Sequence, residues 1–232
     1  MRIRPEVYLI KGRASNIYLC IDDDGLALVD TGMPREQNLV LAEIERLGYQ
    51  PDQLNRILIT HADIDHAGSL AALQETTGAR VFAGAESSRL LQSGKSPDHL
   101  PSLLQWFSNT FFKYKPVDAS YLEIIEDGDE ILVLGGLLAL ATPGHTLDHF
   151  SFYCPSSGVL FAGDALNTRD DRLQRSPKRI TADEAAANAS AIRLLELTPA
   201  VFACGHGQPK DDHKSDDLLI LFNQLRENSP LS

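Results

Sequence analysis

The 232-residue sequence predicts an α/β protein built as a four-layer αββα sandwich, in which two β-sheets face each other and helices cover their outer faces. Two observations lead to this fold class. Each half of the chain opens with short apolar strands that form a meander, and each half continues into segments with helical spacing of apolar residues. A third observation is that no linker separates the halves, so we expect a single domain over residues 1–232.

The first half alternates strands and helices after its opening meander. We expect strands at residues 7–10, 16–21, 26–29, 56–60 and 80–83. Helices are expected at residues 34–48, 69–77 and 86–92, because apolar residues recur there near helical spacing. The acidic turn that ends at Gly25 joins two of the strands as a hairpin, since glycine adopts φ > 0 at little cost.

The second half repeats this order without detectable sequence repetition. Strands are expected at residues 121–125, 131–134, 137–141, 150–153, 159–162 and 200–203. A helix over residues 182–196 would be capped by Thr181, and a short C-terminal helix is expected over residues 215–226.

Residues 93–119 interrupt the pattern as a helical insertion rich in aromatic side chains. Apolar residues at helical spacing between residues 100 and 111 predict either a helix packed on the core or a lid or subunit contact. A subunit contact would make the chain a homodimer. Trp106 and Phe107 could then line the substrate site beside an apolar acyl group.

Composition narrows the class of protein. The net charge of -11 argues against nucleic acid as a partner, because binding phosphates requires a basic surface. The three cysteines are far apart and odd in number, which is typical of reduced thiols in the cytoplasm. No apolar run has the length of a membrane span or the pattern of a signal peptide, so we expect a cytoplasmic protein with no membrane contact.

The densest group of potential metal ligands follows the apolar run 57–59. It contains His61, Asp63, Asp65 and His66 within six residues. Imidazole nitrogens and carboxylate oxygens bind first-row divalent ions, and four such groups exceed the needs of one ion. We therefore expect two metal ions here. The alternative is a polar loop followed by a helix that Asp65 caps.

Three later strands also end in potential ligands. His145 follows the strand at 137–141, Asp164 follows the strand at 159–162, and His206 follows the strand at 200–203. Each lies next to a glycine, which lets the backbone turn closely. A single histidine after a strand is more often structural, but four such strand ends in one chain indicate a shared site.

In this order the motifs resemble those of the metallo-β-lactamase superfamily, which has an Asp after an early strand, then H-x-H-x-D-H, His, Asp and His. The matching positions are Asp30, residues 61–66, His145, Asp164 and His206. Five ordered motifs make the resemblance specific for the fold. They are less specific for the substrate, because the superfamily includes β-lactamases, thioesterases, lactonases, phosphodiesterases and redox enzymes.

The resemblance also implies how the ligands divide between two ions. One ion would be held by His61, Asp63 and His145. The other would be held by Asp65, His66 and His206, with Asp164 as the bridge. Asp30 and His149 would support these ligands without binding metal. Cys204 would be a small buried residue beside His206, or would tune the site.

Position 63 departs from the superfamily pattern, because it is Asp where the usual motif has His. It is similar in this respect to the H-x-E-x-D-H motif of flavodiiron proteins. The ligands would then be four imidazoles and three carboxylates, which lowers the charge of the loaded site and favours harder metals. Zinc is the expected metal, and Asp63 leaves iron or manganese as alternatives.

We therefore expect a metal-dependent hydrolase. Hydroxide formed from metal-bound water would attack a small ester, thioester, lactone or phosphodiester, and Asp65 would orient it or carry a proton to the leaving group. One alternative is a non-heme iron redox enzyme, either with two irons or, as in persulfide dioxygenases, with one iron held by His61, His145 and Asp164. Another alternative is a protein that binds metal or a ligand without turnover.

Hints about the substrate are few. Arg169 and Arg172 belong to a basic loop after Asp164 that could bind an anionic substrate, or that is solvated and paired with neighbouring aspartates. The glutathione thioesterases of the superfamily carry a longer helical C-terminal region, and the lack of one here argues against a glutathione thioester.

Overall fold

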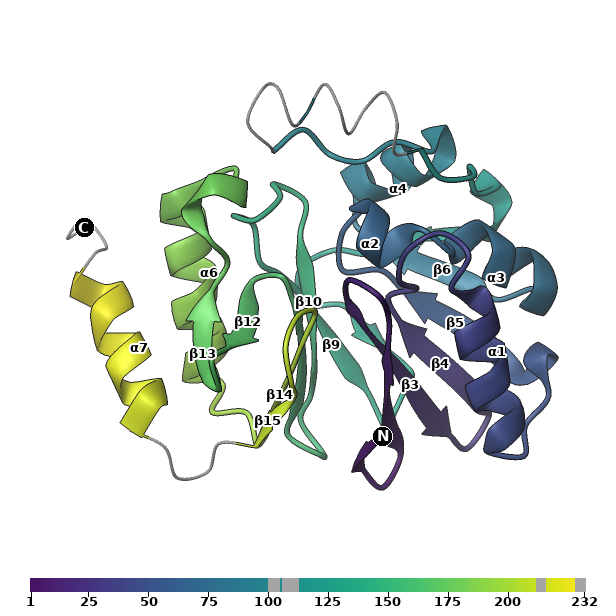
Figure 1. Cartoon of the computed structure of the whole chain (residues 1–232), viewed down its shortest axis with the longest axis horizontal. Coiled ribbons are helices and arrows are strands. Elements are labelled where there is room, and N and C mark those ends of the chain that lie inside the picture. The colour runs from purple at the N-terminus through teal and green to yellow at the C-terminus, as the bar shows by residue number, and fades with distance from the viewer. Residues whose placement is uncertain (100–104, 106–112, 212–215, 228–232) are drawn as a thin grey trace.

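Two β-sheets pack face to face, and helices cover the outer face of each sheet (Figure 1). The computed structural model describes residues 1–99, 105, 113–211 and 216–227. The four-layer αββα fold predicted from the sequence is confirmed, whereas the single-domain organisation stays a prediction. Within the described residues, no helix combines the length and apolar character needed to cross a membrane.

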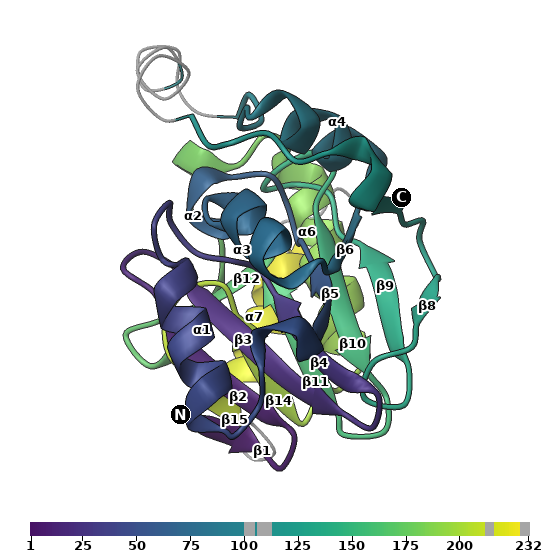
Figure 2. The ribbon, with the colours of Figure 1, turned by 90° about the vertical axis from the view of Figure 1, so that its right-hand side faces the viewer.

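The first sheet has the strand order β1-β2-β3-β4-β5-β6-β7. These strands span Arg2–Arg4, Val7–Lys11, Asn16–Asp22, Gly25–Val29, Leu54–Leu58, Arg80–Ala83 and Leu122–Ile124. β1 to β4 form an antiparallel meander, and β4 to β7 pair in parallel. Parallel pairing requires crossover connections, which contain α1 (Gln37–Arg46), α2 (Ile64–Ala67), α3 (Leu70–Thr77) and α4 (Ala85–Ser93). Figure 2 shows α1 and α3 in front of this sheet.

The second sheet has the order β15-β14-β11-β10-β9-β8. These strands span Lys210–Asp211, Val201–Cys204, Val159–Gly163, Phe150–Cys154, Leu137–Ala141 and Glu130–Ile131. Its outer face is covered by α6 (Glu184–Glu196) and α7 (Asp216–Glu227), on the left in Figure 1. Short 3-10 helices occupy Pro51–Gln53, Ala119–Tyr121 and Lys178–Ile180.

Three apolar cores lie between the layers. They form because successive side chains of each strand point to opposite faces of the sheet. In β3, Ile17 and Leu19 face α1 and α3, whereas Tyr18 and Cys20 face the other sheet. In β11, Phe161 faces the first sheet, whereas Leu160 packs against α6. Successive side chains of a strand point to opposite faces, so a strand buried on both sides is apolar throughout.

The residues after Asp164 form a hairpin, so the prediction of a loop there is wrong. Its strands are β12 (Leu166–Arg169) and β13 (Arg172–Arg175). The turn residues Asp170 and Asp171 have φ angles of 51° and 59°, as a two-residue hairpin turn with positive φ at both positions requires. No apolar pattern indicates this hairpin in the sequence, because its strands are largely polar.

Smaller differences concern element ends. The side chain of Asp183, and not that of Thr181, caps α6 by accepting a hydrogen bond from the backbone N–H of Ala186. The strand expected at 131–134 is the shorter Glu130–Ile131, because Leu134 adopts a φ of 52° and turns the chain before Gly135. Most of the helix expected between 100 and 111 lies outside the described residues.

Candidate metal centre

Four strand ends deliver the predicted ligands to one place. The side chains of residues 61–66 follow β5, His145 follows β9, Asp164 follows β11 and His206 follows β14. Two groups of these residues have ligand atoms within 4.8 Å of one another, namely His61, His145 and Asp164, and Asp65, His66 and His206. A cavity of about 260 Å³ is lined by members of both groups, namely His145 and Asp164 of the first and Asp65 and His206 of the second.

Asp63 occupies the N-cap position of α2, but its carboxylate does not cap the helix. Its Oδ2 atom lies 3.3 Å from Nε2 of His61 and 3.3 Å from Nε2 of His145. An N-cap Asp ordinarily accepts hydrogen bonds from the first turn of its helix. The side chain of Asp63 instead faces the imidazoles of His61 and His145. The alternative of a helix capped by Asp65 is wrong, since the helix begins at Ile64.

Asp164 lies between the two groups. Its Oδ1 atom is 3.3 Å from Nε2 of His66, and its Oδ2 atom is 3.5 Å from Nε2 of His145 and 3.2 Å from Nε2 of His206. Gly205 makes this approach feasible, because a Cβ atom at that position would lie 2.5 Å from Oδ1 of Asp164. The carboxylate therefore contacts a histidine of each group.

The orientation of three histidines is fixed through their Nδ1 atoms. Nδ1 of His66 lies 2.8 Å from Oδ2 of Asp30, and Nδ1 of His206 lies 3.0 Å from the carbonyl oxygen of Ala14. The hydroxyl of Thr60 donates to Asp30, and its oxygen lies 3.0 Å from Nδ1 of His61, from which it can accept a hydrogen bond. A proton on Nδ1 leaves the Nε2 lone pair of each ring directed into the cluster, as a metal ligand requires.

His149 lies behind the cluster with both ring nitrogens engaged. Its Nε2 atom accepts a hydrogen bond from the backbone N–H of Asp164 at 2.9 Å, and its Nδ1 atom lies 2.8 Å from Oγ1 of Thr142. No lone pair of this ring is free for a metal ion. His149 therefore holds the backbone of Asp164 in position.

Burial and neighbouring charges shift the pKa values of Asp164 and His66 in opposite directions. Burial raises the pKa of Asp164, but His66 and His206 outweigh this effect and hold the pKa well below its ordinary value. Burial likewise lowers the pKa of His66, but Asp164, Asp65 and Asp30 outweigh it and raise the pKa well above 6.5. Asp164 therefore remains ionised in the buried site and attracts cations.

The residues present fit a divalent metal. Among the described residues, Nε2 of His61, Nε2 of His66 and Oδ1 of Asp164 are buried and have no hydrogen-bond partner. A buried polar atom without a partner costs free energy, and a metal ion coordinated by these atoms would remove that cost. Imidazole nitrogens and carboxylate oxygens are ligands of zinc, iron and manganese.

The remaining predicted site residues are not among the candidate ligands of the described chain. Burial raises the pKa of Cys204 to about 12, so its thiol stays protonated, and it belongs to no group of candidate ligands in the described chain. Arg169 and Arg172 are exposed on the β12–β13 hairpin and do not line the metal cavity. Trp106 and Phe107 lie outside the described residues.

His99 joins the site without having been predicted. Its Nε2 atom lies 3.2 Å from Oδ2 of Asp63, and its side chain is only 4% exposed. It forms a third group of candidate ligands with Asp63 and His145. The sequence carried no signal for it, because His99 follows neither a strand nor a glycine.

The sequence model of the Metallo-beta-lactamase superfamily matches residues 10–206. The chain therefore belongs to this superfamily, and it is a metallo-hydrolase of that class. This confirms the resemblance drawn from the five ordered motifs.

Individual relatives agree with the family. The chain is 26% identical to a probable metallo-hydrolase, YflN, of Bacillus subtilis strain 168, over 91% of this chain and 88% of that protein. It is 32% identical to a hydroxyacylglutathione hydrolase of Rhodopseudomonas palustris strain BisB18, over 64% of this chain and 47% of that enzyme. Among solved structures, Rm3 metallo-beta-lactamase matches with a TM-score of 0.72 at 26% identity, over 89% of this chain and 77% of that one.

Proposed function

We propose that the chain is a dinuclear metallo-hydrolase that cleaves a small ester, thioester, lactone or phosphodiester. The position of Asp164 carries this proposal. Its carboxylate contacts His145, which belongs to the first group of ligands, and His66 and His206, which belong to the second. A carboxylate shared in this way suits two ions held side by side, as in two-metal hydrolytic sites.

When bound, the ions would lower the pKa of water to near neutrality and polarise the oxygen of the scissile carbonyl or phosphoryl group. Asp65 would accept or transfer the proton of the attacking water. Its Oδ2 atom lies 3.6 Å from Nε2 of His206 and borders the metal cavity, and its side chain is partly exposed. A carboxylate in this place can orient the attacking water and pass a proton to the leaving group.

We propose zinc as the resident metal, with iron or manganese as the competitors that Asp63 favours. The cluster combines four imidazoles with three carboxylates, and the hard carboxylate oxygens reduce its preference for zinc. A cytoplasmic location is likewise proposed, and it is supported by three buried free cysteines, which are typical of a reducing compartment. The homodimer stays a prediction.

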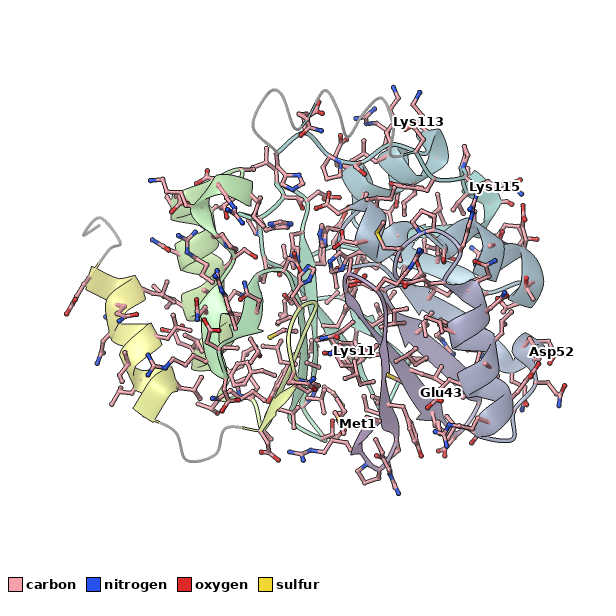
Figure 3. All side chains as sticks on the ribbon, in the orientation of Figure 1. Met1, Lys11, Glu43, Asp52, Lys113 and Lys115 are labelled. Carbon is pink, nitrogen blue, oxygen red and sulfur yellow. The ribbon has the colours of Figure 1, made fainter. Side chains whose placement is uncertain are left out.

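A larger cavity beside the metal site supports the proposal that the substrate is anionic. Its volume is about 550 Å³, and it shares Ser96 and Pro97 with the metal cavity. Arg89, Lys95 and Lys113 line it together with Glu86 and Asp98, and Arg89 is paired with Glu86. Lys113 lies at the edge of the molecule beside α4 (Figure 3). The lysines would attract a carboxylate or phosphate at the end of the substrate remote from the metals.

Metal analysis combined with a substrate panel tests the proposal. The protein is purified anaerobically, stripped and reloaded with zinc, manganese or iron, and the ions per chain are counted. We expect two ions and turnover of at least one member of a panel of thioesters, lactones and phosphodiesters. Asp164→Asn should bind fewer ions and lose roughly 100-fold or more of the rate.

The matched control is Asp52→Asn, which changes an exposed carboxylate at the outer edge of the molecule (Figure 3). It should leave both metal content and rate unchanged. Two bound ions without turnover of any panel member would contradict the hydrolase and favour a protein that only binds metal or a ligand.

A mononuclear iron oxygenase is the second candidate. The observation that favours it is the first ligand group, His61, His145 and Asp164, because two histidines and one carboxylate form the ligand set of many non-heme iron oxygenases. One iron per chain together with oxygen consumption in the presence of a persulfide would support this candidate and overturn the hydrolase.

A further inference from the structure

Four potential ligand atoms are gathered around position 63. Nε2 of His61, His145 and His99 lie 3.3, 3.3 and 3.2 Å from Oδ2 of Asp63. In a tetrahedral site with bonds of about 2.0–2.1 Å, neighbouring ligand atoms are about 3.3–3.4 Å apart. The contacts of Asp63 therefore have the length expected between ligands that share one ion.

A hydrogen bond from Nδ1 would give His99 the tautomer that a metal ligand requires. Its Nδ1 atom lies 3.3 Å from the carbonyl oxygen of Pro97, which can only accept a hydrogen bond. Without a metal ion, the N–H group at Nε2 can donate to the carboxylate of Asp63 at 3.2 Å. A metal ion would take the place of that proton, while the proton on Nδ1 stays paired with Pro97.

The segment that carries His99 is tied to the metal-binding loop. The buried hydroxyl of Tyr114 lies 3.0 Å from the carbonyl oxygen of Ala62 and 2.6 Å from that of Lys95. Ala62 stands between His61 and Asp63, so this contact joins residues 95–99 to the metal-binding loop itself. The backbone N–H of His99 also donates to Oε1 of Gln105 at 3.0 Å.

His99 shares its surroundings with the other ligands. Its ring packs edge-on against His145 with centroids 4.8 Å apart, and its side chain lines the metal cavity together with Asp63, His145 and Asp164. The side chain of His99 is only 4% exposed, and its Nε2 atom meets Oδ2 of Asp63 at 3.2 Å beside this cavity. A metal ion bound here would take both atoms as ligands.

We propose that His99 is a direct ligand of the ion held by His61, Asp63 and His145, and that it adds a third imidazole to that site. With the shared carboxylate of Asp164, this ion would have five protein ligands and the ion at Asp65, His66 and His206 would have four. The first ion would therefore have less room for water than the second. This inference rests on the metal binding of the proposed function but not on its hydrolytic reaction.

Cobalt substitution tests the assignment without an activity assay. The stripped protein is titrated with Co²⁺ in competition with a chelator, and visible absorption and hyperfine-shifted imidazole N–H protons are recorded. In His99→Gln we expect one of the two ions to bind at least about tenfold more weakly. We also expect a changed absorption band and one fewer shifted imidazole proton than in the wild type.

Gln92→Ala, an exposed position on α4 before the same segment, is the matched control and should match the wild type in all three measurements. Tyr114→Phe keeps His99 but removes the hydroxyl that joins the segment to Ala62. It should weaken the same ion by a smaller factor and keep the full number of shifted protons. It also provides a second reading if His99→Gln folds poorly.

Each other outcome has a distinct meaning. Equal affinity and equal spectra in the wild type and His99→Gln would overturn the ligand role of His99 and leave the dinuclear hydrolase intact. Weaker binding with an unchanged number of shifted imidazole protons would overturn it as well, because His99 would then act only through Asp63. A wild type that binds no cobalt would contradict the proposed function instead.

Discussion

The Nδ1 atom of His66 lies 2.8 Å from Oδ2 of Asp30, and this contact directs the Nε2 atom of His66 toward Asp164. Asp30 is itself held by Thr60, whose backbone N–H donates to Oδ1 at 2.9 Å. Two buried loops are thus joined through one carboxylate, and its charge makes the imidazole a better ligand.

Asp30→Asn should weaken metal binding without removing a ligand. The amide keeps the shape of the side chain but loses the charge that orients His66. We expect affinity for one ion to fall by about 10- to 100-fold, as measured by chelator competition. Asp52→Asn, on the surface, should have no effect. Unchanged affinity in Asp30→Asn would contradict the orienting role of Asp30.

Asp63→His should move metal preference toward zinc. The substitution replaces an anionic oxygen ligand with a neutral nitrogen, and nitrogen ligands suit zinc better than manganese. We expect the ratio of bound zinc to bound manganese to rise by roughly tenfold when the stripped protein is reloaded from an equal mixture. The control is Asp52→His, which adds an exposed imidazole far from the site. An unchanged ratio would remove Asp63 from the set of ligands.

Protonation of His149 should destabilise the metal-free protein in acid. Burial, followed by the neighbouring His61 and His145, lowers the pKa of His149 well below 6.5. The unfolded chain takes up a proton near pH 6.5 while the folded chain does not, so the stability that this group contributes is present above that pH. It is lost as the pH falls, by at most about 1.4 kcal/mol per pH unit.

The measurement is urea unfolding of metal-free wild type and His149→Gln between about pH 7.5 and 5. Gln can still accept the hydrogen bond from the backbone N–H of Asp164, but it does not titrate. The free energy of unfolding should therefore fall more steeply with acid in the wild type than in the variant. Parallel curves would show that His149 titrates alike in both states.

Phe161→Ala should destabilise the core between the two sheets. Phe161 is fully buried there and packs edge-on against Tyr18 of the other sheet at 5.5 Å. Truncation leaves a cavity that the rigid sheets cannot close, at a cost of about 3–5 kcal/mol. Leu132→Ala, at a side chain that is 73% exposed, should cost less than about 0.5 kcal/mol. Chemical unfolding measures both, and equal effects would contradict this account of the core.

The positions of the main candidate ligands were predictable because a short-range sequence pattern marks each of them. His145, Asp164 and His206 all follow an apolar strand and lie beside a glycine, and residues 61–66 concentrate four ligands within one loop. The ends of the strands are determined by short-range pattern, and the edges of packed sheets bring such ends together. The sequence therefore determined the fold class and the positions from which the ligands come.

Contacts between segments far apart in the chain could not be predicted in this way. Only the tertiary structure places His99 against Asp63 and turns that carboxylate away from capping its helix, because both depend on how residues 94–99 pack over the metal-binding loop. The polar β12–β13 hairpin likewise has no apolar pattern to indicate it. The sequence by itself determined the family and the main set of candidate ligands. Long-range packing decided what surrounds Asp63, since burial and distance depend on the folded chain as a whole.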